Sequence, residues 1–168
     1  SLKKILKWSW ERRGKNLETF EFETREPNYQ KIYENEDIMI TWIGHESFLY
    51  QNKDINILTD PHFTERASPF SFAGPKRYMA PGMAIEDLPN IDVVTISHSH
   101  YDHLDYETVK SLSEKFKNIL FVVPLGLKEW FEGKGIYNVK ELDWWDSIKV
   151  QQTAITFAPV QHWSARGL

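Results

Sequence analysis

The sequence predicts a layered α/β fold, and three observations lead to it. The chain has 168 residues, which is enough for one domain with a core of its own. Residues 38–59 hold several β-branched and aromatic runs bounded by Gly, Asn, Asp or Pro, a pattern typical of antiparallel strands. After residue 90, strand-like apolar runs alternate with helix-like segments. Strands alone, followed by strands alternating with helices, indicate layers of both element types.

Composition excludes several classes of protein. With 20 Lys and Arg against 24 Asp and Glu, the net charge is −4, which argues against a nucleic-acid partner bound through overall basic charge. The chain has no Cys, so disulfides, thiolate metal ligands and a Cys nucleophile are excluded. No apolar run is long enough to span a bilayer, and no secretory signal is seen. We therefore expect a cytoplasmic location or one peripheral to a membrane.

Residues 1–36 are expected to form an N-terminal extension, a basic helix followed by an acidic linker. The first fifteen residues are rich in Lys and Arg, and Leu2, Ile5 and Leu6 are spaced for one face of a helix. Such a helix either packs a few apolar residues on the domain or contacts anionic lipid. Residues 37–168 are expected to form the domain itself.

The first elements of the domain are strands. We expect strands at residues 38–43, 47–50 and 55–59, the first two joined by a Gly-His-Glu turn. Residues 63–89 form a long connection whose aromatic and Met content favours an ordered loop. A short buried strand is expected at residues 91–96.

The later elements alternate between the two types. Val109, Leu112 and Phe116 recur at spacings of three and four, which predicts a helix from Asp105, as N-cap, to about residue 117. A strand is expected at 119–123 and a short helix at about 127–132. Two further strands are expected, at residues 139–142 and 153–158.

Residues 98–103 carry the motif H-x-H-x-D-H, between a predicted strand and a predicted helix. His98 and His100 point to the same side in extended backbone, because side-chain direction has a period of two. The chain then turns, so Asp102 and His103 can face the same cavity. Nitrogen and oxygen ligands in this arrangement suit zinc or a similar divalent ion. A His-rich exposed turn is the alternative, and four potential ligands together favour the metal.

Four residues outside this motif are further candidates. His162 follows a β-rich run and is the better choice for a third imidazole on the same metal. Asp60 could orient a ligand His or could cap a turn. For His45 a structural hydrogen bond is favoured over ligation. His62 is expected to be exposed.

The H-x-H-x-D-H motif resembles that of the metallo-β-lactamase superfamily. Longer segments, from about residue 38 to the last residue, are similar to N-acylphosphatidylethanolamine-hydrolysing phospholipase D and its bacterial relatives. These segments are Thr41-Trp42-Ile43-Gly44-His45, Leu58-Thr59-Asp60-Pro61, Arg66-Ala67-Ser68-Pro69, Gly74-Pro75-Lys76-Arg77, Ile96 through Asp105, Val123-Pro124-Leu125-Gly126-Leu127, Glu141-Leu142-Asp143-Trp144-Trp145 and Gln161-His162-Trp163.

The resemblance implies an αββα sandwich of two similar halves, of which this chain carries mainly the N-terminal half and is incomplete at the C-terminus. It implies two zinc ions. His98, His100 and His162 would bind one, and Asp102 and His103 would help to bind the second. Asp102 is also the residue to which we assign a catalytic role. A bridging Asp and a final His ligand would come from outside these 168 residues.

The resemblance further implies a phosphodiester hydrolase. Two divalent ions would lower the pKa of a bridging water, and the resulting hydroxide would attack the phosphorus of an N-acylated phosphatidylethanolamine, a phospholipid substrate. We expect this chain alone to be inactive. The alternatives are hydrolysis of a soluble ester, a lactone or a nucleic-acid phosphodiester, and a non-catalytic metal-binding half-fold.

A half-sandwich would leave one sheet face uncovered. The strands at 38–43 and 93–96 would expose apolar side chains, and soluble monomers rarely expose a large apolar patch. We therefore expect the second half of the fold, or a second copy in a homo-oligomer, to cover that face.

Overall fold

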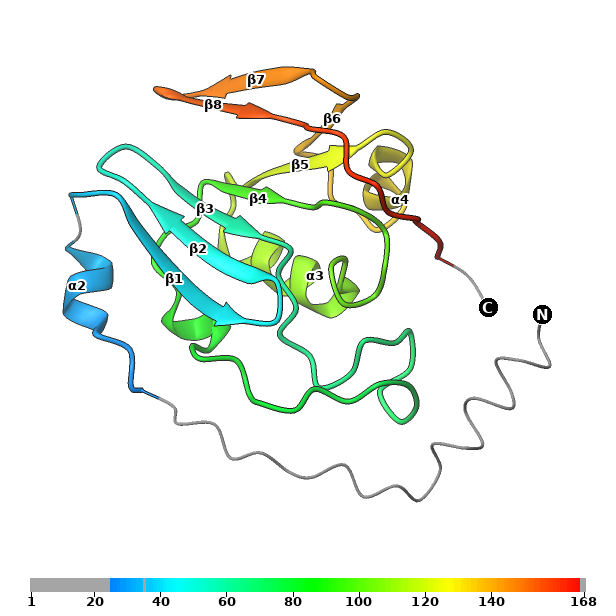
Figure 1. Cartoon of the computed structure of the whole chain (residues 1–168), viewed down its shortest axis with the longest axis horizontal. Coiled ribbons are helices and arrows are strands. Elements are labelled where there is room, and N and C mark those ends of the chain that lie inside the picture. Colours follow the sequence, from blue (N-terminus) through cyan, green and yellow to red (C-terminus); the bar gives the residue numbers. More distant parts are fainter. Residues whose placement is uncertain (1–24, 35, 167–168) are drawn as a thin grey trace.

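The computed structural model describes residues 25–34 and 36–166, which form a six-stranded sheet, a separate two-stranded hairpin and short helices (Figure 1). The sheet follows chain order, from β1 to β6. The first two pairings are antiparallel, and the remaining three are parallel. The α/β fold predicted from the sequence is confirmed. The strands are β1 (Met39–Gly44), β2 (Ser47–Gln51), β3 (Asn56–Thr59), β4 (Val93–Thr95), β5 (Leu120–Pro124) and β6 (Val139–Leu142).

Helices cover one face of this sheet. They are α2 (Tyr29–Tyr33), the 3-10 helix η1 (Ile85–Asp87), α3 (Tyr106–Lys115) and α4 (Lys128–Glu132). The main core lies between this layer and the sheet, where Val109 and Leu112 of α3 are buried with Leu58, Val94 and Phe121 of the strands. The amphipathic spacing that predicted α3 is therefore the spacing of its buried face.

Helix α3 begins where the sequence predicts. Asp105 occupies the N-cap position, but its side chain makes no capping bond to the helix. It accepts instead from the backbone N–H of Thr64, at 3.1 Å, and from the hydroxyl of Thr108, at 2.6 Å. Asp105 thus ties the start of α3 to the long connection after β3.

The opposite face of the sheet is covered only in part. The hairpin of β7 (Ser147–Val150) and β8 (Thr153–Thr156), drawn at the top of Figure 1, packs on a second core cluster that includes Ile57, Val93 and Val122. Strand β7 was not predicted. Away from this hairpin, Ile38, Ile40 and Trp42 at and beside β1 are 73%, 64% and 56% exposed. Among the described residues, the surface over β1 is therefore apolar and uncovered. The expectation that residues 93–96 would also expose apolar side chains is wrong: Val93, Val94 and Ile96 are buried, and Val93 belongs to the cluster on which the hairpin packs.

Strand direction brings distant segments to one edge of the sheet. Strands β1, β3, β4 and β5 all run the same way, because two antiparallel pairings restore the direction of β1 in β3. Their carboxyl ends therefore meet at one edge. The turn after β1 carries His45, β3 ends before Asp60, and the H-x-H-x-D-H loop follows β4. This topology places the candidate site residues together.

The predicted basic helix lies in residues 1–24, outside the described part of the chain. No helix of residues 25–34 and 36–166 is long and apolar enough to cross a membrane. The division of the chain at residue 36 stays a prediction. Within the expected extension, α2 packs on the domain through its buried residue Ile32.

Candidate metal centre

The loop between β4 and α3 is shaped by its own backbone. Ile96 N–H donates to the carbonyl of Val122 on β5, at 3.0 Å, which fixes the start of the loop. The N–H groups of His103 and Leu104 both donate to the carbonyl of His100, at 3.2 and 2.8 Å, which closes a turn. The chain therefore reverses after His100, as expected from the motif, and returns Asp102 and His103 toward the first two histidines.

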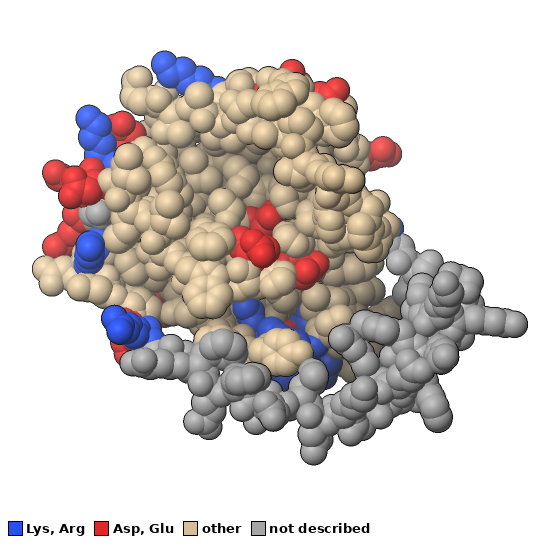
Figure 2. All heavy atoms as spheres, in the orientation of Figure 1, with Lys and Arg blue, Asp and Glu red and all other residues tan. Residues whose placement is uncertain are grey.

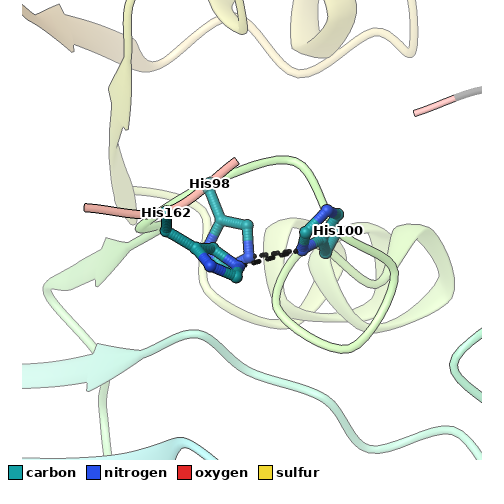
Figure 3. A group of neighbouring side chains, drawn as sticks. All are labelled: His98, His100 and His162. Atoms are coloured by element: carbon teal, nitrogen blue, oxygen red, sulfur yellow. Dashed lines mark hydrogen bonds between the residues drawn. The ribbon is translucent and has the colours of Figure 1, made fainter. Parts of the chain in front are cut away.

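His98, His100 and His162 lie together, as their positions in the sequence predicted; we call them the three-His cluster. His98 Nε2 and His162 Nε2 lie 2.8 and 3.3 Å from the same atom, His100 Nδ1 (Figure 3). One nitrogen from each ring can be chosen so that all three lie within 4.8 Å of one another. Three imidazoles at this separation are a suitable donor set for a divalent transition metal.

Two observations show that these rings fit a metal. Burial and then the three neighbouring imidazoles lower the pKa of His98 to about 4, so the ring is neutral near pH 7. Neutral imidazole is the form that binds metals. The second ring nitrogen of His100, Nε2, is buried and has no hydrogen-bond partner among the described residues. His98 is thus neutral, and His100 has a ring nitrogen without a competing hydrogen bond.

His45, Asp102 and His103 form a second group, which we call the mixed cluster. One ligand atom from each lies within 4.8 Å of the other two. His45 Nε2 donates to Asp102 Oδ2 at 3.0 Å, and His103 Nε2 lies 3.7 Å from the same oxygen. Burial raises the pKa of Asp102, but the charge of His103 and the hydrogen bond from His45 help to lower it, and the net shift is downward. Asp102 is therefore an ionised carboxylate near neutral pH.

Asp60 orients rings in both clusters. His103 Nδ1 donates to Asp60 Oδ2 at 3.0 Å, which leaves His103 Nε2 as the ring's lone-pair nitrogen. The hydroxyl of Ser97 donates to the same oxygen at 2.7 Å and lies 2.8 Å from His98 Nδ1. A proton on His98 Nδ1 then points at the Ser97 oxygen, so the lone pair of the His98 ring is on Nε2. Metal-binding histidines commonly have such hydrogen-bonded partners.

The two clusters adjoin. The ring centroids of His98 and His103, one from each cluster, are 4.1 Å apart. Burial lowers the pKa of His103, but the hydrogen bond that His103 donates to Asp60 and the charges of Asp60 and Asp102 outweigh it and raise this pKa. One cluster thus consists of imidazoles only, and its neighbour contains a carboxylate.

For residues outside the motif, the structure corrects one expectation and confirms another. His62 was expected to be exposed, which is wrong: it is 3% exposed, because Pro61 and His62 follow β3 into the core and His62 N–H donates to the buried Ser47 hydroxyl. His45 makes the expected hydrogen bond, but its partner is Asp102 of the motif. Only the strand order brings His45 and Asp102 together, so their sequence spacing carries no signal.

Sequence analysis missed one side chain that braces the loop. Arg166 Nη1 donates to the carbonyls of Ser99 and Leu104, at 3.0 and 2.6 Å, and its guanidinium lies 4.3 Å from the centre of the Tyr101 ring. Arg166 follows His162 by four residues. It therefore holds the segment that carries His162 against the loop that carries the other ligands.

Relatives of known name share much of this chain. The N-acyl-phosphatidylethanolamine-hydrolyzing phospholipase D 1 of Caenorhabditis elegans is 41% identical over 140 residues, which cover 78% of this chain and 39% of that protein. A metal-dependent hydrolase of Methanopyrus kandleri is 28% identical over 123 residues, covering 73% of this chain and 46% of that protein. The chain thus spans less than half the length of these two relatives.

Solved structures agree on the fold. CmlA, a diiron β-hydroxylase from Streptomyces venezuelae, has a TM-score of 0.57 at 22% identity, covering 74% of this chain and 24% of that one. Igni18, a metallo hydrolase from Ignicoccus hospitalis, has a TM-score of 0.56 at 18% identity, covering 76% of this chain and 50% of that one.

The family assignment follows from the sequence profile. The profile of the beta-lactamase superfamily domain matches residues 55–168, which include both β4 and the complete ligand loop. The strand order, the loop geometry and the structural neighbours agree with this match. The chain belongs to the metallo-β-lactamase superfamily.

Proposed function

We propose that this chain supplies ligands of a dinuclear zinc centre that hydrolyses phosphodiesters, with an N-acylated phosphatidylethanolamine as the substrate. The observation that carries the proposal is the pair of adjoining clusters, each with three potential ligands within 4.8 Å. The worm relative, named as a phospholipase D acting on that phospholipid, supports the choice of substrate.

The residues divide into groups with different tasks. His98, His100 and His162 would hold one ion through neutral imidazoles, and Asp102 and His103 would help to hold a second. Bound ions would supply Lewis acidity at phosphoryl oxygens and a lowered pKa for water. Asp102 stays ionised, so it can also accept a hydrogen bond from the attacking water, which is the catalytic role proposed for it.

Metal content is the first test. The purified chain is stripped with a chelator, titrated with Zn²⁺ or Co²⁺, and measured by elemental analysis and by the visible spectrum of the cobalt form. We expect bound metal with imidazole ligation. A chain that binds no metal under these conditions would contradict the proposal.

Activity is the second test. The resemblance places further ligands outside these 168 residues, so the chain is fused to the remaining part of the worm relative, and the unfused chain serves as control. Vesicles that contain N-acylated phosphatidylethanolamine are compared with a soluble phosphodiester. We expect zinc-dependent release of N-acylethanolamine by the fusion and no turnover by the chain alone. Hydrolysis of the soluble diester only would favour a different substrate class.

A further inference from the structure

A cavity of about 980 Å³ adjoins the mixed cluster, and neither metal site uses most of it. It lies between residues 25–29, the end of β1 with its turn, and the loop at 75–84. His45 and Asp102 belong both to its wall and to the mixed cluster, so the cavity opens on the candidate metal centre. Much of the remaining wall is apolar, including Trp42, Met79 and Pro81.

Arg77 brings a positive charge to this wall without an ion-paired carboxylate. The three hydrogen bonds that its guanidinium donates to described residues end on backbone carbonyls: Nε to Met79, at 2.6 Å, and Nη1 to His62 and Thr64, at 3.1 and 3.3 Å. Within residues 25–34 and 36–166, no acidic side chain lies within ion-pair distance of it. Burial lowers the pKa of Arg77, and only the more distant Asp105 opposes this effect.

The second terminal nitrogen of Arg77, Nη2, lies beside Gly44 at the end of β1. A Cβ built on Gly44 would stand 3.3 Å from Arg77 Nη2, so the glycine leaves room for the guanidinium there. Gly44 also has a φ of +144°, which other residues rarely adopt. The Arg77 guanidinium therefore lies against the same turn that carries His45.

The His62 ring lies on the same wall, and one of its two ring nitrogens has no hydrogen-bond partner among the described residues. His62 is 3% exposed, and this nitrogen is Nε2. A buried polar atom without a partner is uncommon in folded proteins and costs stability unless a ligand or water satisfies it. Among the described residues, a guanidinium without a carboxylate partner and an imidazole nitrogen without a hydrogen-bond partner thus line one cavity.

We propose that this cavity binds a phosphate-type oxyanion through Arg77, beside the metal centre. Arginine is well suited to phosphate because its planar donors match the oxygen geometry. Basic side chains of the wall, namely Arg25, Lys76 and Arg77, outnumber its carboxylates, Glu26 and Asp102. On the face shown in Figure 2, Lys and Arg side chains gather just below a group of carboxylates, so opposite charges adjoin on this surface.

The oxyanion site goes beyond the proposed hydrolase and is tested without metal. Binding of inorganic phosphate and of hexyl phosphate is measured by calorimetry on chelator-treated protein. We expect saturable binding of inorganic phosphate, with a dissociation constant on the order of 1 mM or tighter. Tighter binding of hexyl phosphate would assign the site to a phosphate ester with an apolar group, and equal binding would assign it to free phosphate.

Two variants and one control identify the site. Arg77→Gln is expected to weaken phosphate binding at least about tenfold, since a charge-assisted pair is lost. Lys76→Gln removes the same charge from a neighbouring side chain that is already paired with Glu65 at 2.5 Å, and it is expected to have little effect. Because Arg77 also braces the loop, Ala80→Glu is added. It leaves the bonds of Arg77 in place and brings a competing carboxylate to the wall.

The outcomes decide the proposal even though the metal sites stay empty. Loss of phosphate binding in Ala80→Glu, with an unchanged thermal melt, supports the oxyanion site. The proposal is overturned if the unaltered protein shows no saturable phosphate binding below about 10 mM. It is also overturned if Arg77→Gln and Ala80→Glu fold normally and bind phosphate as the unaltered protein does. Failure of the proposed hydrolase would appear instead as absent metal binding, a separate measurement.

Discussion

The three-His cluster and the mixed cluster adjoin, but they are held in place differently. In the mixed cluster, His103 donates directly to Asp60, and Asp102 accepts from His45. In the three-His cluster, only His98 reaches Asp60, through the Ser97 hydroxyl, while His162 comes from a segment after β8. The mixed cluster is thus fixed by hydrogen bonds from the sheet edge. The three-His cluster depends on the segment after β8, which the side chains of Arg166 and Ser164 hold against the loop through hydrogen bonds.

The two clusters therefore depend on different features. The three-His cluster depends on the number of its ligands, and the mixed cluster depends on the groups that orient its ligands. The three-His cluster offers three imidazole ligands, so losing any ring removes a donor. The mixed cluster has an ionised carboxylate, so its geometry depends on the groups that orient Asp102 and His103. Substitutions of ligands and of orienting residues should therefore have effects of different size and location.

The largest effect is expected from His100→Ala. His100 Nδ1 is the atom that both other rings of the three-His cluster face, so its loss leaves two imidazoles. We expect metal affinity at this cluster to fall by at least about a hundredfold, beyond the effect of losing an orienting partner. Competition with a chromophoric chelator measures it, and Gln161→Ala, beside His162, is the control. Unchanged affinity would remove His100 from the metal site.

Asp60→Asn is expected to affect both clusters. The change keeps the size of the side chain, but it replaces the carboxylate that accepts from Ser97 and His103. We expect metal affinity to fall roughly 10–100-fold at each cluster, as for other orienting partners of metal ligands.

Asp54→Asn is the matched control for this change, since Asp54 precedes β3 and Asp60 follows it. Cobalt spectra resolve the two sites if their ligand sets differ. A loss confined to one cluster would show that the Ser97 link does not orient His98.

A smaller effect is expected from His45→Ala. The hydrogen bond that the structure gives the His45 ring is to Asp102, so we treat His45 as a positioning residue. We expect about a tenfold loss of affinity at the mixed cluster and none at the three-His cluster. His45→Gln retains an N–H donor and should recover most of the loss. Equal losses in both variants would instead make His45 a ligand.

The sequence was informative where chemistry is local. The H-x-H-x-D-H spacing, the strand before it and the helix after Asp105 all depend on neighbours within a few residues, and the structure has them as predicted. The positions of His45, His62 and Arg166 depend on which strands lie side by side. Side-chain periodicity does not encode this, because β1 reaches the site only through the order of the whole sheet.

The interpretation of Asp60 shows this limit within one residue. Its place before Pro61 fitted both an orienting carboxylate and a turn cap. The structure gives it an orienting contact with His103, which lies 43 positions away, and a positive φ of 36° at the turn. The carboxylate accepts only from Ser97 and His103 among the described residues, which supports the orienting interpretation, and only the fold could decide between the two.

The smallest expected effect is a pH dependence of stability from His62, measured without metal. Burial is the main cause that lowers the pKa of His62, so the folded protein keeps the ring neutral where the unfolded chain, with a pKa near 6.5, takes up a proton. The unfolded state then binds more protons, and the free energy of unfolding falls as the pH drops below about 6.5. One such group contributes at most about 1.4 kcal/mol per pH unit.

His98 acts in the same direction, so the comparison is made between the unaltered protein and His62→Gln, both treated with chelator. Urea unfolding at several values between pH 7.5 and 5 should give a flatter dependence for the variant. Equal slopes would show that His62 is protonated to the same extent in both states, and its buried nitrogen would then have a partner that the described residues do not supply.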